Sequence, residues 1–250
     1  MKAIILVAGM GTRLKPLTDT APKCLTEVNG KSILFNMLEQ LNGVGVEETI
    51  LVIGYLGNQI KEGIGDKFEN MKITYLENDI YNQTNTSYSL LVGLKDLEID
   101  DTLLVLEGDV FFEKALLIKF LNDGFSTSTV VQKYNPNLDG SFVELNGNKV
   151  VDWIHKKARP TGFTIEDKFK TVNIHKFDGL FLKNVLKPVL NQHVEEKKGT
   201  EPIEFVMQDI VKEKQEKIHA FETGALKWFE IDNIAELRIA EEMFKEVTIK

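Results

Sequence analysis

The sequence predicts an α/β fold with a mainly parallel central sheet and a small antiparallel lobe. Over the first 125 residues, short apolar runs alternate with segments of helical periodicity, as in βαβ units. After residue 125 the apolar runs are shorter and are joined by Asn/Gly turns, which is typical of antiparallel strands. A chain of 250 residues can bury the core of one such domain.

Each expected element follows from its hydrophobic pattern. Apolar runs bounded by glycine or polar residues predict strands at 2–8, 48–55, 71–78, 102–110, 128–134, 141–147, 148–154 and 170–177. Helical spacing predicts helices over 32–44, 58–68, 86–97, 180–193 and 201–214, and a strand that runs into a last helix over 228–244. We therefore expect a single domain, 1–250, with halves 1–125 and 126–232 and a C-terminal helix, 233–250.

Composition excludes several classes of protein. The formal net charge of −8 argues against nucleic acid as a partner, so an anionic ligand would need a local basic site. The single cysteine, Cys24, excludes an intramolecular disulfide and a multi-cysteine zinc site. The first apolar run is too short for a signal peptide or a membrane span, so we expect a cytoplasmic protein without membrane contact.

The loop after the first strand, "AGMGTRLKPLTDTAPKC", is rich in glycine and basic residues. It is not a dinucleotide fingerprint, because Leu14 stands where the third glycine belongs, and it lacks the G-K-[ST] of a Walker A loop. Gly9 and Gly11 would let backbone N–H groups approach a phosphate. Arg13 and Lys23, ten positions apart, suit an extended triphosphate. A simple turn with solvated charges is the alternative.

The string "AGMGTRLKPLT…PKCLTEVNGKSIL" resembles the signature of the sugar-phosphate nucleotidyltransferase superfamily. The resemblance implies a Rossmann-like, three-layer nucleotidyltransferase fold that joins a nucleoside triphosphate to a phosphorylated acceptor and releases pyrophosphate. It makes Arg13 and Lys23 catalytic, with residues 1–125 binding the nucleotide and 126–232 the acceptor. It also assigns nucleotide binding to Val7, Ala8, Gly9, Gly11 and Thr12. Val7, Cys24 and Ser32 depart from the usual pattern without removing a charge.

Two acidic positions are candidate metal ligands. Glu107 and Asp109 end a buried strand, and Mg²⁺ on a triphosphate is held by one or two carboxylates and phosphate oxygens. The resemblance assigns a metal role to Asp109 and places the second metal aspartate in "KWFEIDN", as Asp232, with Glu230 as the alternative. The alternatives are structural roles: a turn at the strand end for Asp109, and a helix cap over 233–236 beside Asp232.

The segment "NTSYSL", residues 85–90, bears on which base is bound. It resembles the choline-phosphate cytidylyltransferase branch more than the sugar enzymes, which implies CTP with Asn85 and Ser87 at the nucleotide. Asn85 or Thr86 could equally be a helix N-cap, and both roles can hold together.

The acceptor site is expected in the second half of the chain. "KTVNIHKF" resembles the superfamily strand that carries a substrate-binding asparagine, here Asn173, and Lys170 could meet the acceptor phosphate. An ammonium headgroup would need carboxylates, for which Glu107 and Glu201 are available, or aromatic faces. The available aromatic residues are Trp153, Trp228 and Tyr88. Glu201 could instead be part of an acidic first turn of a helix.

These features predict Mg²⁺-dependent transfer of CMP from CTP to a small phosphorylated or phosphonylated acceptor such as phosphocholine. The nucleophile would be a phosphate oxygen that is already ionised, so no general base is required. The alternative within the class is a sugar-1-phosphate nucleotidyltransferase that uses UTP, dTTP or GTP. The alternative from another class is a catalytically silent nucleotide-binding regulator. The sequence leaves open whether the chain forms a homodimer.

Overall fold

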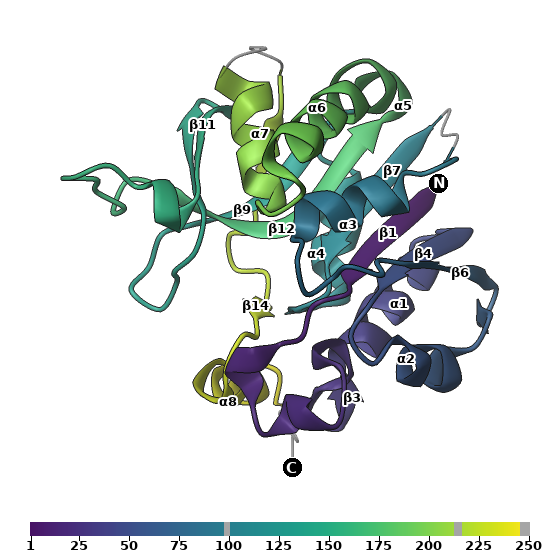
Figure 1. Ribbon diagram of the computed structural model, residues 1–250. Helices are drawn as coiled ribbons and strands as arrows, with labels where there is room; N and C mark the ends of the chain where they lie inside the picture. Colours follow the sequence, from purple (N-terminus) through teal and green to yellow (C-terminus); the bar gives the residue numbers. More distant parts are fainter. Residues whose placement is uncertain (98–100, 213–216, 246–250) are drawn as a thin grey trace.

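A computed structural model describes residues 1–97, 101–212 and 217–245 (Figure 1). Its centre is a ten-stranded sheet of order β10-β11-β13-β9-β12-β7-β1-β4-β6-β5. The strands, in chain order, are β1 Lys2–Val7, β4 Glu48–Ile53, β5 Lys67–Phe68, β6 Met71–Glu77, β7 Thr102–Glu107, β9 Ser128–Lys133, β10 Phe142–Asn146, β11 Lys149–Ile154, β12 Phe169–Asp178 and β13 His219–Glu222. Two small pairs lie outside it, β2 Glu27–Val28 with β3 Lys31–Ser32 and β8 Val110–Phe112 with β14 Trp228–Glu230.

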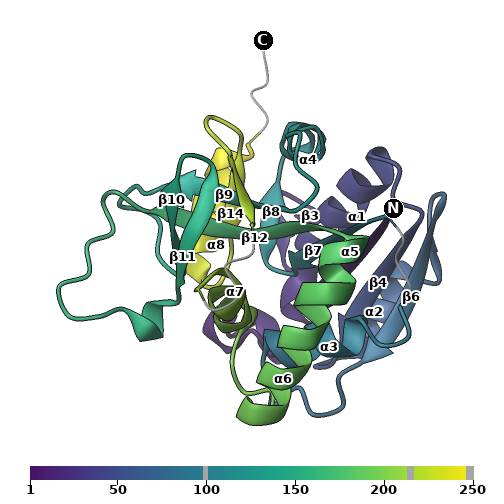
Figure 2. The same ribbon diagram turned by 90° about the horizontal axis from the view of Figure 1, so that it is seen from above.

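Helices cover both faces of the sheet and make three layers (Figure 2). They are α1 Ile33–Gly43, α2 Gly57–Ile64, α3 Thr86–Gly93, α4 Lys114–Leu121, α5 Gly179–Phe181, α6 Lys187–Lys197, α7 Ile203–Lys212 and α8 Ile234–Met243. One apolar core includes residues of α1, α2, α4 and α8, and the other includes residues of α3, α6 and α7. Burial from both sides explains why residues 3–7 of β1 are continuously apolar.

The parallel part of the sheet is formed by β7, β1, β4 and β6, which confirms the predicted fold class. Strand β12 then runs antiparallel to both β7 and β9. The expected antiparallel strands are present, but they extend the central sheet instead of standing apart from it. Within this second half, β9 and β13 are parallel.

Several elements differ from expectation at their ends. The helix expected over 58–68 stops at Ile64, because Gly65 has φ +76°, and residues 67–68 form β5 against β6. Helix α4 was not predicted. Segment 179–197 contains a π-helical turn, Leu182–Leu186, between α5 and α6. The expected helices 201–214 and 233–250 are observed as α7 and α8, and 213–214 and 246–250 lie outside the described residues.

Membrane crossing has no support in the described part of the chain, where each helix is too short or too polar to span a bilayer.

Candidate active site

A cavity of about 370 Å³ opens where the carboxyl ends of β1 and β7 meet. This is the edge at which open α/β sheets bind ligands. Most of the residues predicted from the sequence line it: Val7, Gly9, Gly11, Thr12, Arg13, Lys23, Asn85, Glu107, Asp109, Lys170, Asn173 and Asp232.

The glycine-rich loop folds back on itself after β1. Gly11 has φ +58°, and its carbonyl accepts hydrogen bonds from Leu14 N and Thr18 Oγ1 at 2.9 and 2.8 Å. A Cβ at position 11 would lie 2.7 Å from Cβ of Lys23. Glycine is therefore required at this position by both backbone conformation and space. The close approach is what brings Lys23 beside the start of the loop.

Two cations and two carboxylates meet at this edge. Nζ of Lys23 lies 2.8 Å from Asp109 Oδ2 and 2.5 Å from Asp232 Oδ1, and Arg13 lies 2.7 Å from Asp232 Oδ2. Burial alone would lower the pKa of Lys23, but the two carboxylates outweigh it and raise the pKa. Burial would raise the pKa of Asp232, but Lys23 and then Arg13 hold it below its usual value.

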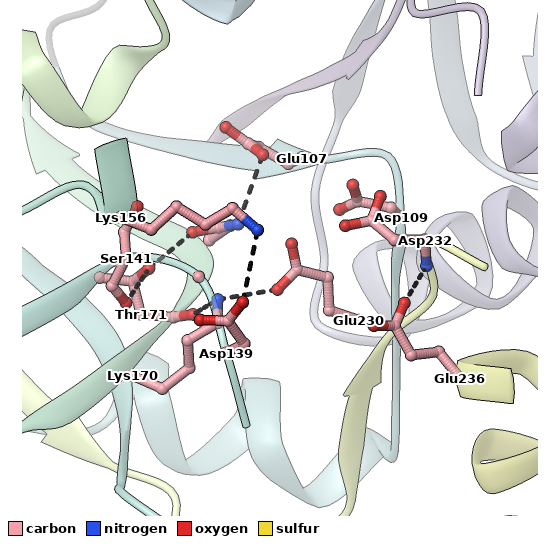
Figure 3. A network of polar contacts seen from close by, with 12 residues as sticks. Glu107, Asp109, Asp139, Ser141, Lys156, Lys170, Thr171, Glu230, Asp232 and Glu236 are labelled. Carbon is pink, nitrogen blue, oxygen red and sulfur yellow. Dashed lines mark hydrogen bonds and ion pairs between the residues drawn. The ribbon is translucent and has the colours of Figure 1, made fainter. Parts of the chain in front are cut away.

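Backbone pairing brings Asp232 to Asp109 across more than a hundred residues of sequence. Strand β14 pairs with β8, and Ile231 N donates to the carbonyl of Asp109 at 2.9 Å. The two aspartates consequently lie side by side (Figure 3). The helix cap exists as well, because Asn233 Oδ1 accepts from Glu236 N and the Glu236 carboxylate accepts from Asp232 N. Both interpretations of this segment are therefore compatible.

The donor set suits a hard divalent cation. Oδ1 of Asp109 is buried and has no hydrogen-bond partner among the described residues, while its other oxygen binds Lys23. No cluster of three or more His, Cys, Asp or Glu side chains able to hold a metal occurs in the described ranges. Asp109 and Asp232 alone match Mg²⁺ that arrives with a triphosphate, since phosphate oxygens and water complete its shell.

The start of α3 faces the same cavity. Asn85 is the N-cap of α3, its Oδ1 accepting from Thr86 N at 2.8 Å, and both residues line the cavity. The neighbouring Ser87 is buried, and its hydroxyl donates to the carbonyl of Glu201 at 2.5 Å. Ser87 therefore holds the turn between α6 and α7, and Asn85 and Thr86 are the polar groups at the cavity.

A distortion in β12 places Asn173 in the cavity. The register with β9 shifts between Thr171 and His175, and Asn173 has φ +61°, a conformation that asparagine tolerates better than most residues. Its side chain accepts from Thr171 Oγ1 at 3.0 Å and donates to Glu107 Oε2 at 3.3 Å. Left-handed residues of this kind cluster at functional sites.

Lys170, also on β12, is committed to protein partners. Its Nζ lies 2.7 Å from Glu230 Oε2 and donates to the carbonyl of Thr171 at 2.7 Å (Figure 3). Burial would lower the pKa of Lys170, but Glu230 outweighs it and raises the pKa. Burial raises the pKa of Glu107 well above its usual value, with further contributions from the charges of Glu204 and Asp109.

Several polar side chains line the cavity that were not assigned to the site from the sequence, among them Thr86, Ser141, His155, Lys156 and Glu204. From the sequence, Glu204 is expected only within the helix over 201–214, and Thr86 only as a possible helix cap. Ser141 directly precedes β10, and His155 and Lys156 directly follow β11. None of the three carries a motif, so nothing in their local sequence marked them.

Other predicted residues lie beside the cavity. The carbonyl of Ala8 accepts from Tyr55 N, and the carboxylate of Glu201 lies 2.9 Å from Nε2 of His193. Trp153 and Tyr88 are not among its lining residues, and Trp228 Nε1 donates to Gln132. Cys24 lines the cavity, but burial raises the pKa of its thiol to about 12, so it carries no thiolate near neutral pH.

Comparison with known proteins agrees with this geometry. A family model described as nucleotidyl transferase matches residues 2–242. CMP-5'-(3-aminopropyl)phosphonate synthase of Streptomyces rubellomurinus is 28% identical over 98% of this chain, and choline-phosphate cytidylyltransferase of Streptococcus pneumoniae is 39% identical over 39% of it. The alignments cover 39% and 41% of these relatives' own length, less than half of each.

The fold has solved counterparts. The structure of a CTP:phosphocholine cytidylyltransferase from Streptococcus pneumoniae superimposes with a TM-score of 0.77, covering 98% of this chain and 99% of that one at 24% identity. At this identity the likeness shows a shared fold.

Proposed function

The chain belongs to the nucleotidyl transferase family, and we propose that it transfers CMP from CTP to a small phosphorylated or phosphonylated acceptor and releases pyrophosphate. One observation carries the proposal: the glycine-rich loop, the pair Arg13 and Lys23, and the pair Asp109 and Asp232 converge on one cavity. Cations and backbone N–H groups at a sheet edge suit a triphosphate, and paired carboxylates suit its metal ion.

The chemistry needs no general base. A phosphate or phosphonate oxygen of the acceptor attacks the α-phosphorus, the bond from the α-phosphorus to the bridging oxygen breaks, and pyrophosphate takes the electron pair. Since a phosphate monoester has a second pKa of about 6, the attacking oxygen is already ionised near neutral pH. Catalysis then depends on positioning and on stabilising the charge that builds up on the phosphates.

Each charged residue has a separate task. Lys23 and Arg13 bind phosphate oxygens and stabilise the charge of the leaving pyrophosphate. Asp109 and Asp232 would hold Mg²⁺, which when bound supplies positive charge to the phosphates. The backbone of Gly9, Gly11 and Thr12 borders the nucleotide, and Asn85 at the start of α3 contacts the base.

CTP is the proposed nucleotide because the relative that aligns over nearly the whole chain makes a CMP derivative, and a second relative is named a cytidylyltransferase. Both names also describe acceptors with a phosphate or phosphonate group and a small nitrogen-containing headgroup. A sugar-1-phosphate nucleotidyltransferase that uses UTP, dTTP or GTP is the second candidate, since it would use the same loop and carboxylates.

Pyrophosphate release, measured for four nucleoside triphosphates against a panel of acceptors with Mg²⁺, tests the proposal. We expect release with CTP and a phosphorylated or phosphonylated small headgroup. Release with a hexose 1-phosphate and none with CTP would support the sugar enzyme instead. Absence of release with every nucleotide, combined with nucleotide binding, would support a silent regulator.

Two lysines of the same loop offer a matched pair of variants. Lys23→Ala removes the cation between Asp109 and Asp232, and we expect kcat to fall by about 100-fold or more. Lys15→Ala removes an exposed lysine whose ion pair among the described residues is with Asp19, at 2.9 Å, so its kcat should stay within about twofold of the parent. Equal kcat for the two variants would contradict the role given to Lys23.

A further inference from the structure

Carboxylate oxygens without hydrogen-bond partners lie around the cavity. They are Oε1 of Glu107, Oδ1 of Asp109 and Oε2 of Glu204, each buried and unpartnered within the described part of the chain. Asp109 is accounted for by the proposed magnesium ion. The oxygens of Glu107 and Glu204 are left without a function in nucleotide binding or phosphoryl chemistry.

Glu204 is the stronger of these two signals. It lies on α7, its side chain lines the cavity, and the residue is only 8% exposed. One oxygen accepts from Ser141 Oγ at 2.8 Å, and the other has no donor. Glu107 repeats this arrangement, because one oxygen accepts from Asn173 and the other has no donor. A buried ionised carboxylate without a full set of donors is costly.

The nearby cations are already committed. Lys170 is bound to Glu230 and to a backbone carbonyl, and Lys156 donates to Asp139 at 3.3 Å. Glu107 and Glu204 therefore both line the cavity with a neutral donor on one oxygen each; the charge of Lys170 acts on both, but neither forms an ion pair with a described residue. The missing partner is a positively charged group that can donate hydrogen bonds.

Resting on the proposed function, we propose that the acceptor carries a primary ammonium group on the end opposite its phosphate or phosphonate, bound by Glu107 and Glu204. A primary ammonium has three N–H donors, which match the two unpartnered oxygens. A quaternary ammonium has no N–H to donate and is recognised by aromatic faces. Among the described residues that line the cavity, His155 is the single aromatic side chain. The site therefore favours an aminoalkyl headgroup over choline.

Three acceptors of the same length test this: 2-aminoethyl phosphate, phosphocholine and 2-hydroxyethyl phosphate. Each is assayed with the nucleotide that gives the most pyrophosphate release. We expect kcat/KM to be at least about 30-fold higher for the primary amine than for either analogue, the factor expected when one partner of a buried charge pair is lost. An equal or higher kcat/KM for phosphocholine or for the hydroxyl compound would overturn the inference.

Glu204→Gln provides the matching variant, because it keeps the shape and the contact with Ser141 while removing the charge. It should reduce the preference for the amine over the hydroxyl compound by at least about 10-fold, and thermal unfolding should show no loss of stability, since an uncompensated buried charge is removed. The control is Glu144→Gln, a half-exposed glutamate of β10 that pairs with Lys168 and should keep the preference. Unchanged preference in Glu204→Gln would overturn the inference.

The two proposals fail in different ways. Release of pyrophosphate with neutral acceptors and not with the amine would reject the ammonium site and keep nucleotidyl transfer. If no acceptor supports release, calorimetric binding of the same three compounds to the full chain, with a non-hydrolysable CTP analogue, still decides the inference. Tighter binding of the amine that is lost in Glu204→Gln supports it, and equal binding of all three overturns it.

Discussion

Gly9 and Gly11 of the opening loop are under different structural constraints. Gly11 is constrained by its own fold, with φ +58° and Lys23 too close for a side chain, whereas a Cβ at Gly9 would meet nothing within 4 Å. The backbone at position 9 is thus free to accept a side chain in the protein itself. If the nucleotide packs against this backbone, the constraint at Gly9 comes from the ligand alone.

This difference predicts a separation of stability from binding. The free energy of unfolding of Gly9→Ala should lie within about 0.5 kcal/mol of the parent's. Its affinity for the nucleotide should fall at least about 10-fold, because the added methyl group would occupy space that the nucleotide needs. Gly11→Ala should lose about 1–3 kcal/mol of stability from the positive φ and the crowding. Chemical denaturation and nucleotide titration measure the two quantities. Full nucleotide affinity in Gly9→Ala would show that the phosphates do not contact this segment.

Residues near a motif were predictable and residues reached only by folding were not. Arg13, Lys23 and Asp109 lie in or after recognisable strings, and the sequence placed them at one sheet edge. Glu204 and Lys156 have no such string, because they reach the cavity through the packing of α7 and the end of β11. The left-handed conformation of Asn173 could not be predicted either, because it depends on a register shift between strands.

At the scale of elements, the turn between α6 and α7 is attached to the start of α3. Asn85 N donates to the carbonyl of Gly199 at 2.8 Å, Ile203 N donates to Thr86 Oγ1 at 2.9 Å, and Ser87 adds the bond to Glu201. The elements that carry Asn85 and Glu204 are therefore joined to each other. The proposed nucleotide and acceptor sides of the cavity share this support.

His193 on α6 also contacts the turn between α6 and α7. Its ring is buried, with Nδ1 2.8 Å from Asp209 Oδ2 and Nε2 2.9 Å from Glu201 Oε2. His193→Ala removes the hydrogen bond to Asp209 and the close contact with Glu201, so we expect a loss of about 2 kcal/mol in stability and a rise of several-fold in KM for both substrates, with kcat changed less. His219→Ala, which removes a ring stacked on Phe125, is the control and should leave KM unchanged.

Periodicity predicted the strands and helices of the first half because each has a long, clear pattern. Helix α4 was not predicted because its eight residues begin one residue after β8 and their apolar pattern resembles a continuation of that strand. The pairing of β13 with β9 joins segments about ninety residues apart, and no local pattern encodes such a partner. The fold class was thus predictable, whereas the order of the outer strands was not.

For the whole molecule, the single sheet makes the site depend on both halves of the chain. Strand β12 joins the parallel part to the outer strands and also carries Lys170 and Asn173. The contact of Lys23 with Asp232 spans 209 residues of sequence. Because the cavity is assembled from both halves, we infer that global unfolding and loss of the site occur together.

The carboxylate of Glu48 links three parallel strands at their amino-terminal ends. Glu48 begins β4, and its oxygens lie 3.1 Å from Lys2 Nζ on β1, 2.7 Å from Lys72 Nζ and 2.7 Å from Thr74 Oγ1 on β6. The hydrogen bond from Lys72, together with those from Thr74 and Lys2, outweighs burial and lowers the pKa of Glu48 to about 2. The ordinary value of 4.5 applies to the unfolded chain.

A folded pKa below the unfolded one means that this carboxylate stabilises the fold above about pH 4.5 and that the contribution is lost as pH falls toward about 2. Glu48→Gln should therefore lose about 1–2 kcal/mol at pH 7, an amount reduced for solvent screening, and its deficit should shrink as the pH is lowered from 5 to 2. Urea denaturation across that range measures it. The neighbouring Glu47 is exposed and its carboxylate lies 3.4 Å from the N-terminal ammonium of Met1, so Glu47→Gln should differ from the parent by less than about 0.5 kcal/mol at every pH. A deficit in Glu48→Gln that stays constant between pH 7 and pH 2 would show that the stabilisation comes from packing and not from charge.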